Sequence, residues 1–421
     1  MKRIKNVLLL AGGDSTRFWP LKDKALTYFL GKPLIVHQIE RLSEYAEKVT
    51  VVSHKDTAVT IKRLIDNLDT KSTCQVVIQK DDLTGQSGAI LTVKNLIRGP
   101  VLILNAADFI DFTLISKLVA KANYQAKVIL TGKKVAEYLS GGYFRMSADR
   151  KIVEIVEKPG ADKMPSNVFR LVADYFFDAG NLIEAIESIK TKSDDQYEKA
   201  INKLISEVGS DYLITDVCVP LKYPWDVLKM LRSFFSEIKK PSIAKSAKIS
   251  KTALIKGQVV IGENVIIGDY VKIVGPTFIG ANSIVGDYSL IRESQIGDDC
   301  LIGSYTEVAR SFIGNKVFLH RNYVGDSVLD DSTMMGAGAV TANLRFDTEN
   351  VTSYVEDEKV DTGLIKLGVI VGSKTKIGVN STTLPGIKIG KNSLVSPREI
   401  VRFDLGDNVY LHKGEERDNN I

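Results

Sequence analysis

The chain has few cysteines and no long apolar run. Its three cysteines, Cys74, Cys218 and Cys300, lie far apart and form no C-x-x-C pair. This spacing argues against a disulfide framework and a structural zinc site, and it predicts a reducing, cytoplasmic setting. No stretch approaches the roughly 20 apolar residues of a membrane span, and the apolar run at 7–10 is too short for a signal-peptide core. The sequence therefore predicts a cytoplasmic protein with no membrane partner.

Charge is nearly balanced along the 421 residues. Lys and Arg number 56 and Asp and Glu number 51, which leaves a formal net charge of +5. That excess is too diffuse to predict a nucleic-acid partner, although it suits anionic, phosphorylated ligands. The chain is longer than one hydrophobic core usually covers, and 44% hydrophobic with 8% aromatic residues is ordinary for a globular protein. We therefore expect two domains.

The second half of the chain carries a repeat of six residues. An aliphatic residue, often followed by Gly, recurs at Ile261, Ile267, Ile273, Ile279, Val285 and Ile291. Neither a helix nor a simple strand has this period, whereas hexapeptide repeats are typical of a parallel β-helix whose stacked coils bury an aliphatic column. The register slips by one at Ile296, returns at Ile302 and reappears at Val371. We predict one β-helical prism from about Ile243 to Phe403.

The first half has a different pattern. Aliphatic runs typical of buried parallel strands alternate with helix-like stretches such as 34–45 and 114–122; the runs lie at 7–10, 49–52, 75–78, 101–104 and 127–130. This alternation predicts a doubly wound α/β domain. Its ligands should bind at the carboxyl ends of strands, where Ala11-Gly12-Gly13 and Asp108 are expected. A glycine-rich turn lets backbone N–H groups approach a phosphate, and Arg17 supplies a cation beside it.

These patterns divide the chain into segments. We predict the α/β domain over 1–238, a linker at 239–242, the β-helix over 243–405 and a frayed polar tail at 406–421. The linker follows a helix-like stretch at 225–238 and has the sequence Lys239-Lys240-Pro241-Ser242.

Three strings carry a family resemblance. The segment 10–33, LAGGDSTRFWPLKDKALTYFLGKP, resembles the signature of sugar-1-phosphate nucleotidylyltransferases. LHRNYVGD at 319–326 and GAGAVTANLRFD at 336–347 resemble the acyltransferase β-helix of bifunctional N-acetylglucosamine-1-phosphate uridylyltransferases, in particular their archaeal-type subgroup. The resemblance covers nearly the whole chain. It implies a nucleotidyltransferase domain followed by a left-handed parallel β-helix with acyltransferase activity.

Nucleotidyl transfer requires a sugar-phosphate oxygen to attack an α-phosphorus in line, while cations and a metal balance the phosphate charge. The resemblance assigns Arg17 and Lys24 to the triphosphate, and Asp108 to Mg²⁺, which prefers oxygen ligands. The nucleotide-binding positions that it implies are Ala11, Gly12, Gly13, Gln79 and Gly85. The implied sugar-phosphate-binding positions are Gly142, Glu157, Lys158 and Asn167. Each residue has a plain alternative as a solvated charge, a turn or a helix cap.

Two residues depart from the family pattern. Ser15 stands where the signature usually has Gly. Pro220 stands six residues before Asp226, where relatives place a second metal ligand, and a proline side chain cannot bind a metal. The second ligand is therefore unidentified, and a weakened or lost transferase activity stays open.

Acetyl transfer requires an unprotonated amine to attack a thioester. Histidine, which titrates near pH 6.5 in model peptides, is the usual general base for such a step. His320 matches the family's H-x-N-Y-V-G-D, in which this His takes the proton from the 2-amino group of a hexosamine 1-phosphate. The resemblance places Tyr323 and Asn343 in segments that hold the same substrate. Arg292 is a candidate for its phosphate, Arg310 competes for that role, and a solvated arginine on the prism is the alternative for both. A structural histidine in the prism is the alternative for His320.

The expected protein partner is a second and third copy of the chain, because relatives pack three prisms in parallel with active sites in the clefts between them. Between Thr341 and Leu367 the repeat lapses for longer than an ordinary turn, which predicts a functional loop. The sequence thus predicts a bifunctional enzyme that uses an NTP, with UTP favoured, a sugar 1-phosphate and acetyl-CoA to make a UDP-N-acetylhexosamine. The alternatives are a monofunctional glucose-1-phosphate uridylyl- or thymidylyltransferase and a decayed scaffold that senses sugar nucleotides.

Overall fold

The computed structural model describes residues 3–418 apart from 14, 111, 123–126, 192, 194 and 217. The chain forms two compact units. The first contains Met1–Asp14 and Leu34–Val219, and the second contains Ser15–Pro33 and Pro220–Ile421. No helix in this described part is long and apolar enough to cross a membrane.

This division differs from the boundary predicted at 238, because two segments of the predicted α/β domain pack on the β-helix. They are residues 15–33 and helix α7 (Asp226–Ser236). Phe29 stacks on Phe234 of α7 with ring centroids 4.9 Å apart, and it meets Phe312 of the β-helix edge-on at 5.6 Å. Burial of these rings places both segments with the β-helix.

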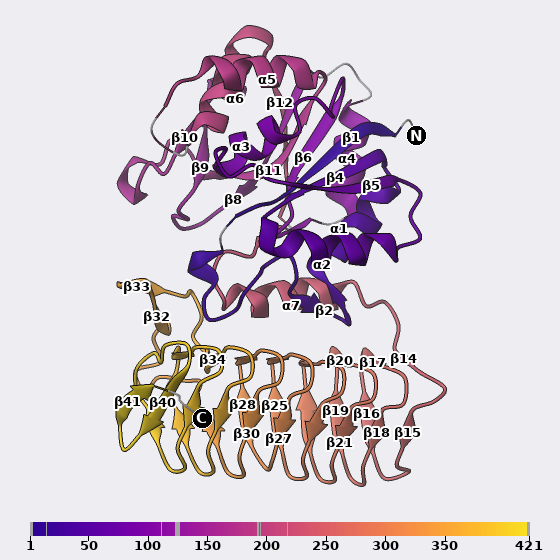
Figure 1. Ribbon diagram of the computed structural model, residues 1–421, viewed down its shortest axis with the longest axis vertical. Coiled ribbons are helices and arrows are strands. Elements are labelled where there is room, and N and C mark those ends of the chain that lie inside the picture. The colour runs from indigo at the N-terminus through magenta and orange to yellow at the C-terminus, as the bar shows by residue number, and fades with distance from the viewer. Residues whose placement is uncertain are drawn as a thin grey trace. The chain divides into compact units, whose positions relative to one another are not determined.

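The first unit is built on a mixed sheet with the order β10-β9-β11-β6-β1-β4-β5, in which β8 pairs with β11 and β12 pairs with β8 (Figure 1). Its strands are β1 (Ile4–Ala11), β4 (Ala46–Ser53), β5 (Thr73–Ile78), β6 (Val101–Asn105), β8 (Val128–Lys134), β9 (Gly142–Met146), β10 (Ile152–Glu157), β11 (Val168–Phe176) and β12 (Asp211–Ile214). Its helices are α1 (Leu34–Ser43), α2 (Lys55–Asp66), α3 (Gly85–Thr92), α4 (Phe112–Ala122), α5 (Ala179–Ser188) and α6 (Gln196–Val208). A short pair joins β7 (Asp108–Ile110) to β13 (Cys218–Pro220).

Helices cover both faces of this sheet. Successive strand residues point to opposite faces, and Val7 and Leu9 on one face are as buried as Leu8 on the other. Helices α3, α5 and α6 share one core with Leu8 and Ile103. Burial on both faces produces continuous aliphatic runs, and the predicted doubly wound α/β architecture is confirmed.

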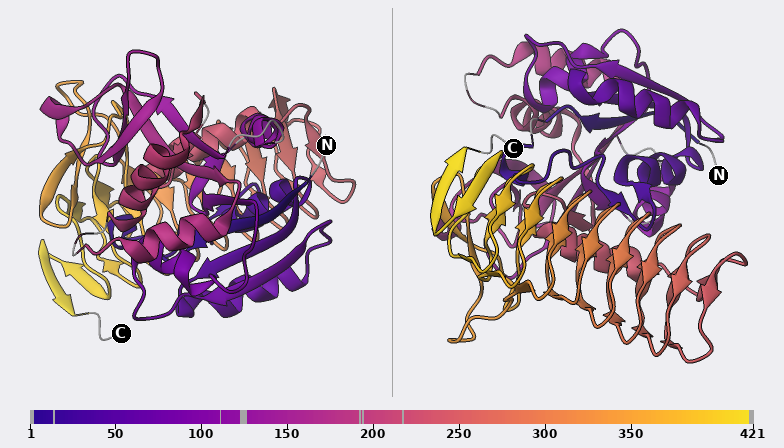
Figure 2. Two further views of the ribbon diagram at one scale, coloured as in Figure 1. Left: turned by 90° about the horizontal axis from the view of Figure 1, so that it is seen from above. Right: turned by 60° about the horizontal axis from the view of Figure 1, so that its bottom comes forward.

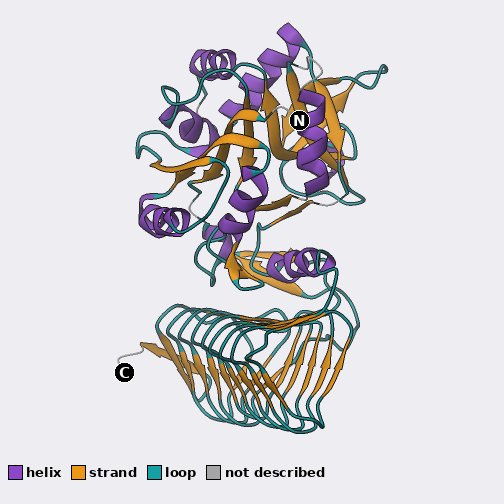
Figure 3. Ribbon diagram, turned by 90° about the vertical axis from the view of Figure 1, so that its right-hand side faces the viewer, coloured by secondary structure: helices purple, strands orange, loops and turns teal. Residues whose placement is uncertain are grey.

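The second unit is a parallel β-helix. The strands of its coils form three sheets within the described residues, and successive coils lie as a stack in Figures 2 and 3. The first sheet contains β14 (Ser242–Ile243), β17 (Val259–Ile261), β20 (Thr277–Ile279), β23 (Gln295–Ile296), β26 (Phe312–Ile313), β29 (Val328–Leu329), β34 (Ile370–Val371) and β37 (Lys388–Ile389). The second contains β15 (Lys248–Ile249), β18 (Ile266–Ile267), β21 (Ile284–Val285), β24 (Leu301–Ile302), β27 (Phe318–Leu319), β30 (Met334–Met335), β35 (Lys376–Ile377), β38 (Leu394–Val395), β40 (Val409–His412) and β41 (Glu415–Asp418). The third contains β16 (Leu254–Lys256), β19 (Lys272–Val274), β22 (Leu290–Arg292), β25 (Glu307–Ala309), β28 (Tyr323–Gly325), β31 (Val340–Thr341), β36 (Thr382–Thr383) and β39 (Ile400–Val401).

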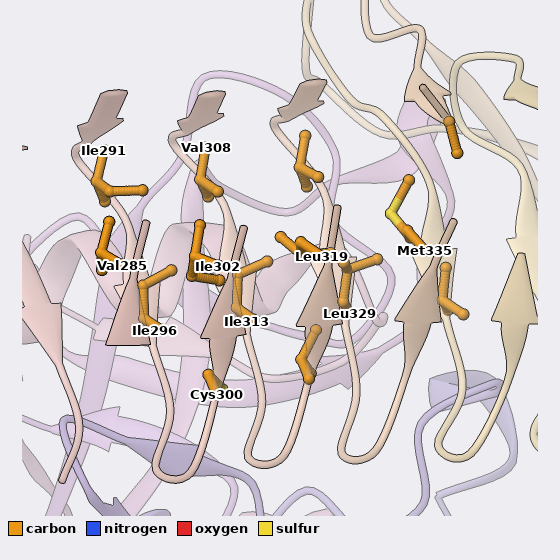
Figure 4. Packing of buried hydrophobic residues seen from close by; sticks show 14 of the residues in the cluster. Val285, Ile291, Ile296, Cys300, Ile302, Val308, Ile313, Leu319, Leu329 and Met335 are labelled. Carbon is orange, nitrogen blue, oxygen red and sulfur yellow. The ribbon is translucent and has the colours of Figure 1, made fainter. Parts of the chain in front are cut away.

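The aliphatic residues of the six-residue repeat form the predicted internal columns (Figure 4). Burial of each such side chain contributes about 1.5–3 kcal/mol, so the column is the main support of the prism. The slip at Ile296 reflects shorter coils: Ile261 pairs with Ile279, 18 residues on, but Ile279 pairs with Ile296, 17 residues on. A corner has lost one residue, while the inward position has been kept.

Two segments interrupt or extend the repeat. The long lapse after Thr341 contains a hairpin of β32 (Thr352–Val355) and β33 (Glu358–Asp361), whose stem is fixed by Ser353 Oγ donating to the Gly386 carbonyl at 2.8 Å. The segment predicted to be a frayed tail contains β40 and β41 instead. Leu411 is buried at 1% exposure, and β40 pairs with β38. Among the strands of the described ranges, the polar β41 pairs only with β40, as expected of a strand that ends a sheet.

Candidate active sites

The carboxyl edge of the first unit's sheet gathers predicted nucleotide-site residues. Strands β1 and β6 are parallel neighbours with Leu10 opposite Asn105, and the Ala106 N–H donates to the Leu10 carbonyl at 3.0 Å. The turn that starts at Ala11 and the carboxylate of Asp108 therefore lie at one edge, as the sequence predicts. Asp108 is 5% exposed, and its Oδ1 accepts a hydrogen bond from Asn105 Nδ2 at 3.1 Å.

Gly12, Gln79 and Gly85 meet at this edge. A Cβ atom at Gly12 would lie 2.0 Å from Oε1 of Gln79, so a side chain at this position would displace the Gln79 amide. The Gln79 amide donates to the carbonyl oxygens of Leu83 at 2.7 Å and Gly85 at 3.2 Å. Gly85 has a φ of +65° and begins α3, whose first N–H groups have no partner within the helix. Together with the exposed Gly13, these groups provide backbone donors of the kind that bind a nucleotide phosphate.

The departure at Ser15 has a conformational explanation. Ser15 has a φ of +54°, in the left-handed region, where glycine is favoured and another residue carries strain of about 1–3 kcal/mol. The usual glycine of the signature would relieve this strain. The serine therefore changes the stability of the turn without adding a charge near Arg17.

Arg17 and Lys24 belong to the second unit. Arg17 is exposed in a 3-10 turn, Thr16–Phe18, and the Lys24 ammonium lies 5.8 Å from the centroid of the Phe18 ring. The Asp23 carboxylate accepts a hydrogen bond from the Ala25 N–H at 2.8 Å, which holds the turn around Lys24. Two cations thus stand on one ordered segment.

The predicted sugar-side residues lie on a pair of strands beyond the carboxyl ends of β1 and β6. Strand β11 pairs with β6 through Ala173–Phe176 but meets β9 at Phe169, nearer its own start. Gly142 of β9 faces Glu157 of β10, and a Cβ atom at Gly142 would lie 3.1 Å from Glu157 Oε2. The Lys158 ammonium is 3.9 Å from Glu157 Oε1.

These three residues form one group, and Asn167 directly precedes β11. The Asn167 carbonyl accepts a hydrogen bond from the Val135 N–H at 2.9 Å, and its side chain is exposed. The Glu157 carboxylate can accept hydrogen bonds from sugar hydroxyls, and the Lys158 ammonium can bind a phosphate.

A buried charge cluster lies beside Glu157. Arg170 forms ion pairs with Asp174 at 2.5 Å and Glu198 at 3.2 Å, and the Tyr197 hydroxyl donates to Asp174 at 3.1 Å. Arg170 also interacts electrostatically with Glu157. Burial raises the pKa of Asp174 to about 6, although the Arg170 charge opposes the shift.

The raised pKa of Asp174 predicts a pH-dependent contribution to stability. Because the folded state binds the proton more tightly, this contribution is complete below about pH 3.8 and declines as the pH rises to about 6. We expect the difference in unfolding free energy between wild type and Asp174→Asn to fall by about 1.4 kcal/mol per pH unit in that window. Urea unfolding from pH 4 to pH 7 measures it. A difference that stays constant with pH would contradict the raised pKa.

In the second unit, polar side chains converge beside Gly325 on the third sheet. The Asp326 carboxylate, 2% exposed, accepts from Arg310 Nε at 2.7 Å and Nη2 at 2.6 Å. The Asn343 amide donates to the same carboxylate and to the Tyr323 hydroxyl, 3.3 Å away. A Cβ atom at Gly325 would lie 2.6 Å from that hydroxyl, so glycine makes room for it. Tyr323 and Asn343, which the sequence predicts to hold one substrate, are thus neighbours.

His320 stands on the corner between β27 and β28. Its side chain is exposed, and the backbone N–H of His320 donates to Asn322 Oδ1 at 2.5 Å. Asn322 is buried and donates to the carbonyl oxygens of Gly336 at 2.8 Å and Ala339 at 3.0 Å, which ties the corner to the following coil. An exposed imidazole on a fixed corner is accessible to a substrate, whereas a structural histidine would be packed inside the prism.

Arg292 occupies a different environment from Arg310. It lies on β22 and donates to Glu307 Oε1 from Nη2 at 2.8 Å and from Nε at 3.2 Å. Arg310, the competitor for the phosphate role, is the arginine bound to the Tyr323 and Asn343 group through Asp326. Sequence reasoning gave no role to Asp326 or Asn322, although both lie in the string that identified His320.

The stem of the insertion lies at this group. The Leu367 N–H donates to the Asn343 carbonyl at 3.0 Å, so the loop that starts after Asn343 returns to it. The loop carries exposed apolar side chains, among them Phe346 and Ile365. The insertion is therefore rooted beside the candidate acetyl-transfer residues.

The metal-site prediction rests on Asp108. Within the described ranges, no group of three or more His, Cys, Asp or Glu residues is placed to hold an ion. Pro220 is part of β13, and the carboxylate of Asp226 accepts hydrogen bonds from the N–H groups of Lys222 at 3.1 Å and Tyr223 at 2.7 Å. Asp226 thus fixes the turn that precedes α7. A single carboxylate still fits Mg²⁺, which keeps several waters and takes its other ligands from substrate phosphates.

Comparison with known proteins gives matches along almost the whole sequence. The family model described as "Nucleotidyl transferase" matches residues 6–225, and the one described as "GMPPB C-terminal domain" matches residues 238–342. The "Bifunctional protein GlmU" of Methanococcus maripaludis strain C7 is 30% identical over 421 residues, covering 98% of both chains. The protein of that name from Methanococcus vannielii is 29% identical over 422 residues, again covering 98% of both.

A third relative comes from another archaeon. The "Bifunctional sugar-1-phosphate nucleotidylyltransferase/acetyltransferase" of Sulfurisphaera tokodaii is 29% identical over 423 residues, with 94% of this chain and 97% of that protein covered. Both halves of the chain are included in these full-length matches. The chain therefore belongs to the nucleotidyl transferase family and, over its full length, to the family of bifunctional GlmU proteins.

Proposed function

We propose that this protein is a bifunctional enzyme of UDP-N-acetylhexosamine synthesis. It transfers a nucleotidyl group from an NTP, with UTP favoured, to a sugar 1-phosphate and releases pyrophosphate. It also acetylates a hexosamine 1-phosphate from acetyl-CoA. Full-length similarity to bifunctional relatives supports both activities, and the convergence of Tyr323, Asn343, Asp326 and Arg310 near the exposed His320 is the observation that carries the second.

For nucleotidyl transfer, the phosphate oxygen of the sugar 1-phosphate attacks the α-phosphorus of the NTP, and the bond to pyrophosphate breaks. Arg17 and Lys24 balance charge on the triphosphate, and the turn at Gly12 with Gln79 and Gly85 binds the nucleotide. Glu157 accepts hydrogen bonds from sugar hydroxyls, and Lys158 binds the sugar phosphate. Asn167 is proposed as an additional contact to the sugar.

Mg²⁺ fits this site as a bound cofactor held by Asp108. The support is the chemistry of the donor, a buried carboxylate at the strand edge beside the glycine turn. When bound, the ion neutralises phosphate charge and helps to align the phosphates. The chain itself holds the Asp108 carboxylate in place, because the Asn105 side-chain amide donates a hydrogen bond to it.

For acetyl transfer, the 2-amino group of the hexosamine 1-phosphate attacks the thioester carbonyl carbon of acetyl-CoA. His320 takes the proton that the amine loses as the C–N bond forms and delivers it to the sulfur as the C–S bond breaks, so that CoA leaves as the thiol. Tyr323 and Asn343 hold the sugar, and Asn343 is itself oriented by Asp326. We assign the sugar phosphate to Arg292, with Arg310 as the second candidate.

Two assays test this function on the purified full chain. The first measures pyrophosphate release with a panel of sugar 1-phosphates and NTPs, and UTP should give the highest rate. The second measures free CoA thiol with acetyl-CoA and glucosamine 1-phosphate. Pyrophosphate release without any acetylation would leave a monofunctional enzyme, and the absence of both reactions would favour a sugar-nucleotide-binding scaffold.

We further propose that the protein is a homotrimer, because relatives build the acetyl-transfer cleft between facing prisms. Multi-angle light scattering should give a mass near three times that of the 46.4 kDa chain. A stable monomer that still acetylates glucosamine 1-phosphate would rule out a cleft shared between subunits.

A further inference from the structure

Residues 19–31, which we call the strap, lie along the first sheet of the β-helix, strand after strand. The strap is part of the same compact unit as the β-helix, and Figure 1 shows β2 (Tyr28–Phe29) beside this sheet. At β20, a Cβ atom on Gly31 would lie 3.2 Å from the Phe278 ring. At β23, Gln295 Oε1 accepts from the Leu30 N–H at 2.8 Å, and Gln295 Nε2 donates to the Tyr28 carbonyl at 2.9 Å.

The middle of the strap meets the next two strands. At β26, the Phe312 ring meets Phe29 edge-on with centroids 5.6 Å apart. After β29, the Lys22 ammonium acts electrostatically on Asp330, and it opposes the rise in the pKa of Asp330 that burial causes. Going from the end of the strap toward its start, each contact therefore falls on a strand farther along the first sheet.

The start of the strap meets the last strands. A Cβ atom on Gly372, which follows β34, would lie 3.0 Å from the Pro20 carbonyl oxygen. At β37, the Lys388 ammonium lies 4.6 Å from the centroid of the Trp19 ring. The Trp19 indole N–H donates to Asp407 Oδ1 at 2.9 Å. The strap is thus held by the β-helix from one end to the other.

These contacts are built into the β-helix. Gln295 is 1% exposed, and each polar atom of its side-chain amide bonds to the strap backbone. An apolar residue at 295 would remove both of these partly buried hydrogen bonds, each of which contributes about 0.5–1.5 kcal/mol. Lys388 has 5% of its side chain exposed and is also paired with Asp404 at 3.2 Å. Buried polar groups of this kind fix one geometry.

Arg17 lies two residues before the strap, and Lys24 lies within it. We infer that the first sheet of the β-helix positions these two cations for nucleotidyl transfer, with Gln295 and Asp407 as positioning residues. The inference rests on the proposed function, because it assigns Arg17 and Lys24 to the triphosphate. It adds that side chains of the β-helix supply the rigidity on which the placement of Arg17 and Lys24 depends.

The first test compares Gln295→Met with Gln258→Met in the full chain. Gln258 is exposed and precedes β17, outside the sheet strands that contact the strap, so it is the matched control. Misplacement of a charged group by about 1 Å can cost about 100-fold in rate, so Gln295→Met should lower kcat for pyrophosphate release by about 10- to 100-fold. Acetylation should stay within about twofold of wild type. Gln258→Met should leave both activities unchanged.

The second test separates positioning from packing at Asp407. Asp407→Asn keeps an oxygen that accepts from the Trp19 indole, whereas Asp407→Leu removes it. We expect Asp407→Leu to lower pyrophosphate release at least fivefold more than Asp407→Asn. Hydrogen exchange of the peptide that contains 19–31 should be faster in Gln295→Met and Asp407→Leu than in wild type and Asp407→Asn.

The outcomes are distinct. Wild-type rates and wild-type exchange in both Gln295→Met and Asp407→Leu would overturn the inference, as would an equal loss of both activities. If the wild type releases no pyrophosphate with any substrate pair, the proposed function fails. In that case the exchange measurement still decides whether Gln295 and Asp407 hold the strap.

Discussion

His320→Ala should lower the rate of acetyl transfer to glucosamine 1-phosphate by about 10²–10⁴-fold, because general-base catalysis is typically worth that factor. The side chain is exposed on its corner, and the buried Asn322 ties that corner to the next coil. The substitution should therefore leave the β-helix intact. Pyrophosphate release should continue at the wild-type rate, since His320 has no role in nucleotidyl transfer.

Two controls make the result specific to the imidazole. His412→Ala removes another imidazole of the same unit, one that hydrogen-bonds Ser396 rather than the candidate site, and it should retain acetylation. Free imidazole added to His320→Ala should restore part of the lost rate, because the corner is open to solvent. A His320→Ala enzyme that acetylates at the wild-type rate would show that the β-helix serves assembly or another acyl chemistry.

Lys24→Ala should reduce pyrophosphate release by about 10²–10³-fold, the cost of removing one preorganised electrostatic group from a transition state. The reduction should appear in kcat as well as in kcat/KM, because negative charge builds on the departing pyrophosphate as the leaving bond breaks. Stopped-flow or coupled detection of pyrophosphate measures it, with UTP and the best sugar 1-phosphate.

Acetyl transfer in the same Lys24→Ala preparation is the internal control, and it should be unchanged. Lys32→Ala removes an exposed lysine of β3 (Lys32–Pro33) in the same segment and should leave pyrophosphate release near the wild-type rate. Equal losses of both activities in Lys24→Ala would indicate a folding defect and remove Lys24 from the catalytic group.

The β-helix could be predicted from sequence because its core is encoded by a local period. Every sixth residue faces inward, so the spacing of Ile261 and Ile279 predicts their pairing without any long-range information. The edge of the α/β sheet was predictable for a similar reason: strands alternating with helices place Ala11 and Asp108 at carboxyl ends. The shortening of coils at Ile296 was visible only as a slip in register.

The contacts between distant polar residues could not be predicted in this way. In the sequence Gln295 is simply the polar residue before Ile296, yet its hydrogen bonds reach residues more than 260 positions away. The hydrogen bond of Trp19 to Asp407 crosses 388 positions. Neither has a periodic signal, so the pattern of the first half placed residues 15–33 in the α/β domain. Asp326 was overlooked because its role, joining Arg310 to Asn343, exists only when coils stack.

The strap restricts how this family member can change in length. Repeat proteins commonly gain or lose whole repeats in evolution, because each repeat contacts mainly its neighbours. Neighbouring strands are about 4.8 Å apart, so the strap crosses about 24 Å between β20 and β37. Insertion or deletion of one coil in that interval would displace Asp407 from Trp19 by a full strand spacing, while Gln295 stayed in place. Coils before β20 can be added or lost without that penalty. The number of coils between Phe278 and Lys388 is instead fixed by the length of the strap, a segment of 13 residues encoded far upstream in the gene.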